Sequence, residues 1–367
     1  MIYLDNAATT LRKPIQVSEA VWEALRSCAN PGRGGHAAAA RAEETVYRTR
    51  KRAAEVFGLE PEQVCFTANA TEGLNIALRT LLKPGDRVVL SGLEHNAVTR
   101  TLTGLGAELV PITAPLFDAE RWQEAFSDAL TADTALCVSL HASNVFGAVL
   151  PVRQIGALCA ERGIPFVVDA SQSAGLLPVR PDEWKAAFVA MPGHKGLMGP
   201  QGTGLLLCRQ QPAPLRFGGT GSSSMDQNMP AELPDRLEAG TLNVPGIAGL
   251  GAALAWLRQQ NLDELLRRER MLLTAATRGL QGMGVQTWTG QNQIGVLSFR
   301  LNHLDNEEAA ARYAKAGIAL RAGLHCAPLA HRTGRTLPDG TIRLSLSVLS
   351  EQKEVDGFLA VTKRMLK

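Results

Sequence analysis

The sequence predicts an α/β protein in which a mostly parallel, doubly wound sheet is followed by a smaller α+β domain. The first observation is a set of short, continuous apolar runs at residues 87–92, 134–140, 165–171 and 187–191. Such runs are typical of strands that are buried on both faces. The second observation is that helix-like segments, among them 121–130 and 152–162, alternate with the runs. This alternation favours a parallel sheet with helices on both sides.

Along the chain, the expected elements fall into an N-terminal segment and two domains. Residues 1–14 form the segment, and the large domain is expected over 15–245, where one helix face carries Leu74, Leu78, Leu81 and Leu82. A stretch rich in Gly, Ser and Pro at 212–236 is expected to be a long loop that leaves the sheet. The small domain is expected over 246–367, with a helix-rich stretch, a strand, a helix and a last strand at 247–281, 295–301, 306–316 and 341–348.

Composition and charge argue against several classes of protein. The chain has 367 residues with a formal net charge of +3 and no block of lysines or arginines, which disfavours a nucleic-acid surface. The first residues lack the apolar core of a secretory signal, and the longest apolar stretch, 247–257, is too short and too glycine-rich to span a bilayer. The six cysteines form neither a CxxC pair nor a zinc-binding spacing. We therefore expect a cytoplasmic protein with reduced thiols, no metal site, and no nucleic-acid or membrane partner.

Polar and ionisable residues follow the expected strands. They are Thr67 to Glu72, Glu94 with His95, Ser143 with Asn144, Asp169 with Ser171 and Gln172, and His194 with Lys195. Ligands of open α/β sheets bind beyond the carboxyl ends of the strands. We therefore expect these side chains to meet at one edge of the sheet.

Lys195 lies in the stretch MPGHKGLMGPQGTG (191–204), which holds five glycines and no acidic residue. Pyridoxal phosphate requires a lysine for a Schiff base, an acid at its pyridine nitrogen, a phosphate cup and a flat group over its ring. These requirements are met in turn by Lys195, Asp169, the helix start at 70–72 and His95. The helix start suits the phosphate because a helix N-terminus favours an anion. The glycines are expected to admit the ring and the phosphate.

Each of these residues also has an ordinary interpretation. Asp169 alone is consistent with a cap at the end of a strand, His95 with a hydrogen-bonded loop histidine, and Thr71 with the N-cap of a helix. The glycines alone are consistent with a turn. A nicotinamide cofactor is disfavoured because no GxGxxG follows the first strand.

Eight segments, in the same order along the chain, resemble a known family. They are YLDNAATT (3–10), FTANATEGLN (66–75), EHNAV (94–98), SNVFGAVLPV (143–152), DASQSAG (169–175), GHKGLMGPQGTG (193–204), LEAGTLNVPGIAGL (237–250) and RAGLHCAPLAH (321–331). They look like class V aminotransferase-fold enzymes, and within that fold they are most similar to cysteine desulfurases and selenocysteine lyases. The resemblance implies fold type I of the pyridoxal-phosphate-dependent transferases and a homodimer with shared sites.

The resemblance also implies roles for single residues. Lys195 would carry the Schiff base, His95 would stack on the ring, and Asp169 would pair with the pyridine nitrogen. Asn144 and Gln172 would flank the phenolic oxygen. The phosphate would be held by Ala70, Thr71 and His194, and by Thr220 from the neighbouring subunit. The substrate carboxylate would be bound by Arg343, whose planar fork suits it, with help from Arg321 and Asn144.

Cys326 is the residue that distinguishes the reaction. A lone cysteine is by default a small buried hydrophobe, and that is the interpretation of Cys28, Cys65, Cys137, Cys159 and Cys208. Cys326 instead follows His325 in a polar loop, and the RxGxHC arrangement resembles that of group II desulfurases. This implies that its thiolate, favoured by a nearby imidazole, attacks the sulfur of L-cysteine to give an enzyme persulfide and L-alanine, while Lys195 moves the α-proton. A metal site that includes His331 is disfavoured by the spacing and by the lack of further ligands.

The sequence departs from the family pattern in three places. Pro192 stands where a Ser or Thr usually contributes a phosphate contact, and Leu324 replaces the first histidine of the frequent GHHC pattern. Leu349 and Ser350 stand where an aromatic residue and Asn are common. Together these departures suggest a branch whose preferred substrate need not be free L-cysteine.

Three functions follow from these residues. The leading one is a pyridoxal-phosphate-dependent cysteine desulfurase that passes sulfur to a protein acceptor, which the sequence does not name. The second is another reaction on the same fold, such as that of a selenocysteine lyase, a C–S lyase acting on a modified cysteine, or an aminotransferase. The third is a sulfur-relay or scaffold protein with little turnover, which is disfavoured because the expected reactive residues are all present.

Overall fold

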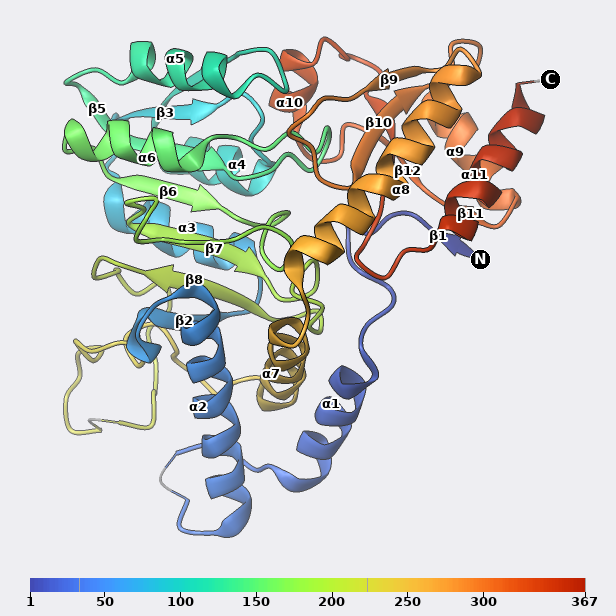
Figure 1. Cartoon of the computed structure of the whole chain (residues 1–367). Helices are drawn as coiled ribbons and strands as arrows, with labels where there is room; N and C mark the ends of the chain where they lie inside the picture. The colour runs from blue at the N-terminus through green and yellow to red at the C-terminus, as the bar shows by residue number, and fades with distance from the viewer. Residues whose placement is uncertain (33, 223, 367) are drawn as a thin grey trace.

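Within residues 1–32, 34–222 and 224–366, which the computed structural model describes, the largest unit is a seven-stranded sheet (Figure 1). Its strands are β2 (Val64–Thr67), β3 (Arg87–Ser91), β4 (Glu108–Ile112), β5 (Thr134–Leu140), β6 (Phe166–Asp169), β7 (Phe188–Pro192) and β8 (Gly204–Cys208), in the order β2-β8-β7-β6-β5-β3-β4. β8 runs antiparallel to both of its neighbours, and the other pairs are parallel. β2, β3, β5, β6 and β7 therefore end at the same edge, and the predicted α/β fold is confirmed.

The strands are buried on both faces because helices cover both sides of the sheet. In β3, Val88 and Leu90 belong to one hydrophobic core and Val89 belongs to the other. The first core lies against α3 (Ala70–Leu81) and α4 (Asn96–Gly104), and the second lies against α2 (Ala37–Phe57), α5 (Ala119–Ala129) and α6 (Val152–Glu161). Figure 1 shows α5 and α6 in front of the sheet and α3 and α4 behind it.

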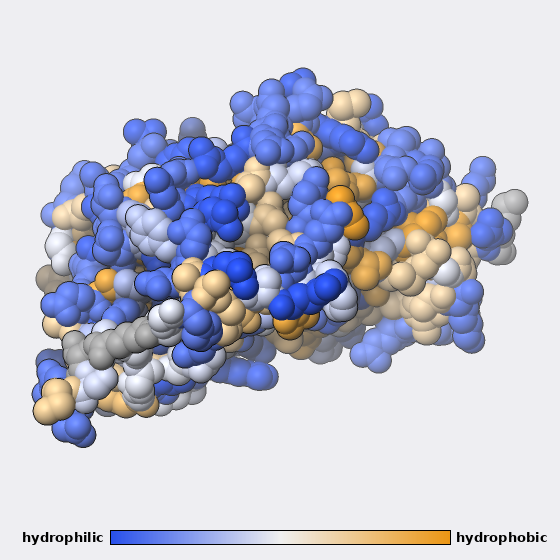
Figure 2. All heavy atoms as spheres, turned by 90° about the horizontal axis from the view of Figure 1, so that it is seen from below, coloured by the Kyte–Doolittle hydropathy of each residue, from blue (hydrophilic) through white to orange (hydrophobic). Residues whose placement is uncertain are grey.

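Helices α1 (Ile15–Ser27) and α7 (Val244–Arg258) pack together with α2 below the sheet (Figure 1). A short 3-10 helix, η1 (Pro61–Gln63), connects α2 to β2. Seen from below, most of the surface is hydrophilic, and hydrophobic residues form small separate patches (Figure 2). No helix in the described part of the chain is long and apolar enough to cross a membrane.

The C-terminal residues form a second sheet beside the first. It contains β9 (Gln286–Trp288), β10 (Val296–Arg300), β12 (Arg321–Gly323) and β13 (Thr341–Ser345), all paired antiparallel in the order β12-β13-β10-β9. The N-terminal strand β1 (Ile2–Tyr3) pairs with β11 (Ile318–Ala319) next to it. Helices α8 (Leu262–Gly282), α9 (Asn306–Lys315), α10 (Pro328–Thr333) and α11 (Gln352–Met365) complete this part. Its core is centred on the packed rings of Phe299, Tyr313 and Phe358.

The structure differs from the sequence-based elements in a few places. The sequence pattern does not predict β4, a partly exposed edge strand whose Pro111 is tolerated because an edge strand leaves N–H positions unpaired. Nor does it predict β8, a short apolar strand that begins at Gly204, the last glycine of the stretch around Lys195. The predicted helical stretch 247–281 is two helices, α7 and α8, and the last predicted strand ends at Ser345.

Candidate active site

A cavity opens at the edge where the parallel strands end. It contains about 540 Å³ of empty space, part of which is continuous with solvent. Its lining includes Ala70, Thr71, His95, Asn144, Asp169, Gln172, His194 and Lys195. The structure thus brings together all the residues that the sequence analysis assigned to a cofactor within one subunit.

Lys195 follows β7 and lies in the wall of this cavity. Burial lowers the pKa of its amine to about 8, an effect that Asp169 opposes and Arg343 increases. In the described part of the chain, Lys195 is hydrogen-bonded only through its carbonyl oxygen. The residue before it is fixed by Thr10, which donates to the His194 carbonyl oxygen from its N–H at 3.1 Å and from Oγ1 at 3.0 Å. The amine is therefore partly buried and has no hydrogen-bond partner in the described part of the chain, on a backbone that is firmly held.

The glycines around Lys195 are required by chain packing. A Cβ atom at Gly193 would lie 2.1 Å from Oγ1 of Thr203, and one at Gly196 would lie 2.3 Å from the carbonyl oxygen of Ala174. Gly202 has a φ of +74°, which glycine adopts more readily than other residues. None of the five glycines, all of which are described residues, lines the cavity that holds Lys195 and Asp169. Chain packing and the turn interpretation thus account for Gly193, Gly196 and Gly202, and the expectation that the glycines admit a ring and a phosphate stays a prediction.

Asp169 and His95 make ordinary local hydrogen bonds and still line the cavity. Oδ1 of Asp169, at the end of β6, accepts the N–H of Ser171 at 2.8 Å. His95 is the N-cap of α4, and its Nδ1 accepts the N–H of Ala97 at 3.0 Å. Burial lowers the pKa of His95, although Asp169 opposes this shift. A neutral ring whose Nδ1 accepts must carry its proton on Nε2.

The first turn of α3 contributes the polar end of the cavity. Ala70 and Thr71 are its first two residues, so their N–H groups have no acceptor within the helix. The N-cap is Asn69, whose Oδ1 accepts the N–H of Glu72 at 3.0 Å, so the interpretation of Thr71 as the N-cap was wrong. His194 lies nearby with Nδ1 3.0 Å from Oγ1 of Thr9, and burial lowers its pKa to about 4. The free N–H groups of the first turn of α3 and the neutral ring of His194 therefore lie at this end of the cavity.

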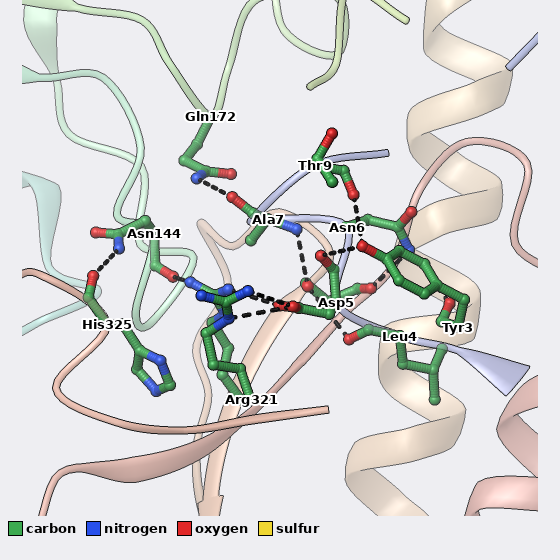
Figure 3. Close-up of polar contacts among 12 residues, drawn as sticks. Tyr3, Leu4, Asp5, Asn6, Ala7, Thr9, Asn144, Gln172, Arg321 and His325 are labelled. Carbon is green, nitrogen blue, oxygen red and sulfur yellow. Dashed lines mark hydrogen bonds and ion pairs between the residues drawn. The ribbon is translucent and has the colours of Figure 1, made fainter. Parts of the chain in front are cut away.

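Arg343 and Arg321 lie beside the cavity and share one carboxylate, that of Asp5. Oδ2 of Asp5 accepts from Nη2 of Arg321 at 2.9 Å (Figure 3). Oδ1 of Asp5 accepts from Nη2 of Arg343 at 2.9 Å. The sequence analysis gave Asp5 no role. Its two partners are 338 and 316 residues away along the chain, so no local pattern could have indicated the contact.

Cys326 is exposed on the loop between β12 and α10, whereas Cys65, Cys137, Cys159 and Cys208 are buried and Cys28 is half-buried. His325 and Cys326 have φ values of +50° and +56°, a region that non-glycine residues seldom occupy. The strained turn is held by hydrogen bonds from the cavity. Nδ2 of Asn144 donates to the His325 carbonyl oxygen at 2.8 Å (Figure 3), and the N–H of Asn96 donates to that of Cys326 at 2.7 Å.

The structure does not support assistance to Cys326 from a charged imidazole. The His325 ring is buried, its Nε2 lies 3.1 Å from the Thr341 carbonyl oxygen, and burial lowers its pKa to about 2. The ring is therefore neutral near pH 7. A charged neighbour is present in Arg321, whose pKa is raised first by its hydrogen bond to Asp5 and to a smaller extent by Cys326.

The remaining predicted site residues lie as follows. Nε2 of Gln172 donates to the Ala7 carbonyl oxygen at 3.0 Å (Figure 3). Thr220 does not line the cavity of its own chain; it lies in the long connection between β8 and α7, where its Oγ1 is 3.0 Å from Oγ of Ser222. Among the residues that the structure describes, no group of three or more His, Cys, Asp or Glu could hold a metal ion.

Two buried polar atoms beside the cavity lack a hydrogen-bond partner in the described part of the chain. They are Oδ1 of Asn144 and Nε of Arg343. Leaving such atoms buried and unpaired costs free energy, which a ligand bound in the cavity would recover. Pyridoxal phosphate requires an unpaired amine, an acid at its pyridine nitrogen, a flat group over its ring and a phosphate cup. Lys195, Asp169, His95 and the free N–H groups of α3 supply this set, so the residues fit this cofactor.

Comparisons with known proteins agree with this geometry. A probable cysteine desulfurase of Pyrococcus abyssi is 33% identical over 385 residues, which cover 100% of this chain and 94% of that protein. A cysteine desulfurase of Escherichia coli O157:H7 is 31% identical and covers 100% and 93% of the two chains. The apo structure of cysteine desulfurase from Thermococcus onnurineus NA1 superposes with a TM-score of 0.91 at 32% identity, covering 100% of this chain and 94% of that one. Because the family described as aminotransferase class-V also matches residues 2–358, the chain belongs to the class-V aminotransferase family, among its cysteine desulfurases.

Proposed function

We propose that this protein is a pyridoxal-phosphate-dependent cysteine desulfurase, which moves sulfur from L-cysteine to Cys326 and releases L-alanine. One observation carries the proposal. The loop that exposes Cys326 is hydrogen-bonded to Asn144, which lines the cavity that contains Lys195, and to Asn96, which follows the lining residue His95. A nucleophilic thiol and a partly buried amine thus belong to the same site.

The cavity residues would hold the cofactor in the way their chemistry suggests. The N–H groups of Ala70 and Thr71, with His194, would bind the phosphate. Asp169 would pair with the pyridine nitrogen, and His95 would cover the ring. When bound, pyridoxal phosphate supplies an aldehyde for covalent attachment and a ring that accepts an electron pair from the substrate. Pro192 lines the same cavity and has no N–H or hydroxyl to add to the phosphate site.

Lys195 is suited both to attachment and to proton transfer. With a pKa of about 8, a useful fraction of its amine is uncharged near neutral pH, whereas an exposed lysine would be almost fully charged. Arg343 would bind the substrate carboxylate, with help from Arg321 and Asn144. This would hold the α-proton of the substrate where Lys195 removes it and later returns a proton.

Cys326 supplies the second nucleophile. Its thiolate sulfur attacks the sulfur of the substrate, so an S–S bond forms and the Cβ–S bond breaks. The electron pair of the broken bond stays with the substrate carbon, which takes up a proton and leaves as L-alanine. Cys326 keeps the sulfur as a persulfide. Because this side chain is exposed, the sulfur can pass on to an acceptor protein.

Two observations support a homodimer. Large hydrophobic residues are exposed on α1 and α2, namely Ile15, Trp22, Leu25 and Tyr47. Single exposed hydrophobic residues are ordinary on a monomer, and a second subunit placed over α1 and α2 would remove these four side chains from water together. In addition, Thr220 lies away from the cavity of its own chain, so its proposed contact with a phosphate would be made in the other subunit.

The test compares alanine and sulfide in one reaction. Cofactor-loaded protein is given L-cysteine and a reductant, beside Cys326→Ala and the matched control Cys28→Ala, which removes a thiol far from the loop in sequence. Equal yields of alanine and sulfide that vanish only in Cys326→Ala support the proposal. Yields that survive the Cys326 substitution would indicate a C–S lyase, and pyruvate or amino transfer would indicate another reaction of the fold.

A further inference from the structure

Two arginines lie directly opposite each other in the second sheet. Arg321 of β12 and Arg343 of β13 are register partners in an antiparallel pair. Like charges in this arrangement repel and destabilise a sheet. The carboxylate of Asp5 lies between them and accepts from Arg343 at 2.9 Å and from Arg321 at 2.9 and 3.1 Å (Figure 3). The three side chains together carry one uncompensated positive charge.

The hydrogen bonds of Arg343 leave one of its three nitrogen atoms, Nε, without a partner in the described part of the chain. Its Nη1 donates to the Asn144 carbonyl oxygen at 3.0 Å and its Nη2 donates to Asp5. Its Nε is buried without a partner in the described part of the chain, although the side chain as a whole is only 3% exposed. Asp5 therefore holds Nη2 of the guanidinium and leaves Nε unpaired. The three charged side chains around this nitrogen keep a net charge of one positive unit.

The backbone around Asp5 is held without its side chain. The N–H of Leu4 donates to the Ala319 carbonyl oxygen at 3.0 Å, and Nδ2 of Asn6 donates to the Ser345 carbonyl oxygen at 2.9 Å. The N–H of Ala7 donates to Oγ of Ser345 at 2.9 Å. The carboxylate is thus not needed to anchor the N-terminal segment. Replacing it is expected to change mainly the orientation and the net charge of the two arginines.

We propose that Asp5 is a positioning residue that determines the specificity of the carboxylate site. It orients Arg343 so that Nε faces the ligand, and it limits the charge of the arginine pair so that the site accepts one carboxylate in preference to two. The inference rests on the proposed function, because that function assigns the arginines to the substrate carboxylate. A simple anion can probe the site without any turnover.

The experiment measures the binding of acetate and of malonate to the cofactor-loaded protein by calorimetry at constant ionic strength. Asp5→Asn keeps the size of the side chain and removes its charge, so the ratio of the two dissociation constants is expected to shift about tenfold in favour of the dicarboxylate malonate. Arg321→Gln removes a positive charge and is expected to shift the ratio the opposite way. Asp5→Glu should keep the wild-type ratio. Arg343→Gln should abolish the binding of both anions, which locates the site.

The control is Asp339→Asn, which alters an exposed carboxylate 3.9 Å from Arg300 and should leave the ratio unchanged. If Asp5→Asn does not fold, Arg321→Gln carries the test, because the Arg321 side chain is half exposed. A wild-type ratio in either charge variant, or a shift of both variants in the same direction, would overturn the proposal. The binding of acetate and malonate does not require L-cysteine. A negative result in this experiment can therefore be distinguished from the absence of desulfurase activity.

Discussion

Among single residues, Lys195, the proposed attachment point of pyridoxal phosphate, is expected to determine the pH range in which the protein takes up this cofactor. An amine attacks an aldehyde only when uncharged, and burial lowers the pKa of this amine to about 8. The rate of pyridoxal phosphate uptake by the apoprotein should therefore rise about tenfold per pH unit below that pKa and level off above it. The absorbance of the attached cofactor measures the rate.

Asp169→Asn gives an internal check on this profile. Because Asp169 raises the pKa of Lys195, its neutral replacement should move the inflection to lower pH. An uptake rate that continues to rise up to about pH 10, as for an exposed lysine, would contradict the assignment.

Glu94 offers a second prediction about a single residue, this time for stability. It is fully buried behind the cavity, where Oε1 accepts from Oγ of Ser91 at 2.5 Å and from the N–H of Leu140 at 2.7 Å. Burial raises its pKa to about 8. The native state therefore keeps a proton that the unfolded chain releases near pH 4, so the contribution of Glu94 to stability is lost as the pH rises from about 4 to 8.

Glu94→Gln cannot ionise and keeps both hydrogen bonds. Relative to wild type, this variant should gain stability with rising pH, by on the order of 1 kcal/mol per unit between about pH 5 and 8. Urea unfolding at these two pH values measures the difference. Glu94→Ala, which leaves the Leu140 N–H without its acceptor, should be destabilised at both. Parallel pH profiles for wild type and Glu94→Gln would show that Glu94 is charged in the native state.

At the scale of elements, the first turn of α3 connects stability to cofactor binding. Oδ1 of Asn69 caps this helix by accepting the N–H of Glu72 at 3.0 Å, and losing such a cap costs about 1 kcal/mol. Because the same turn presents the free N–H groups of Ala70 and Thr71 to the cavity, Asn69→Ala should also weaken the binding of pyridoxal phosphate by the apoprotein several-fold. Fluorescence titration measures this affinity.

Asn261→Ala is the matched control. Asn261 caps α8 in the same way, through the N–H of Glu264 at 3.2 Å, but it does not line the cavity. Its loss should cost similar stability and leave cofactor affinity unchanged. Equal losses of affinity in the two variants would mean that the first turn of α3 has no specific role.

The elements also show what the sequence can and cannot predict. β3, β5, β6 and β7 were found because a strand buried on both faces must be continuously apolar. Because parallel strands end at the same edge of a sheet, the ends of β6 and β7 predict that Asp169 and Lys195 lie at one edge. The edge strand β4 was missed because it is only partly buried. Asp5 was missed for another reason: its contact depends on how two sheets pack, and neither strand carries a signal of that packing.

For the whole molecule, the N-terminal segment connects the two sheets at the site. Thr10 holds the His194 carbonyl oxygen beside Lys195 in the first sheet, and Asp5 holds Arg343 in the second. Ala7, between them, accepts from Gln172. One short stretch of chain thus fixes the distance between the proposed cofactor lysine and the proposed carboxylate arginine.

The exposed face of α1 allows the proposed homodimer to be tested. Trp22 and Leu25 on α1 are each 62% exposed, and a homodimer would cover them. The double variant Trp22→Glu, Leu25→Glu should sediment as a monomer, because two charges would have to be buried in the interface. The monomer should also bind pyridoxal phosphate more weakly, since Thr220 lies outside its own cavity and would no longer reach the phosphate in the other subunit. Met271→Glu, at a position on α8 that is 72% exposed, should remain a dimer with unchanged affinity. A folded monomer that retains full cofactor affinity would mean that one chain completes the cavity by itself, and the shared-site proposal would then be wrong.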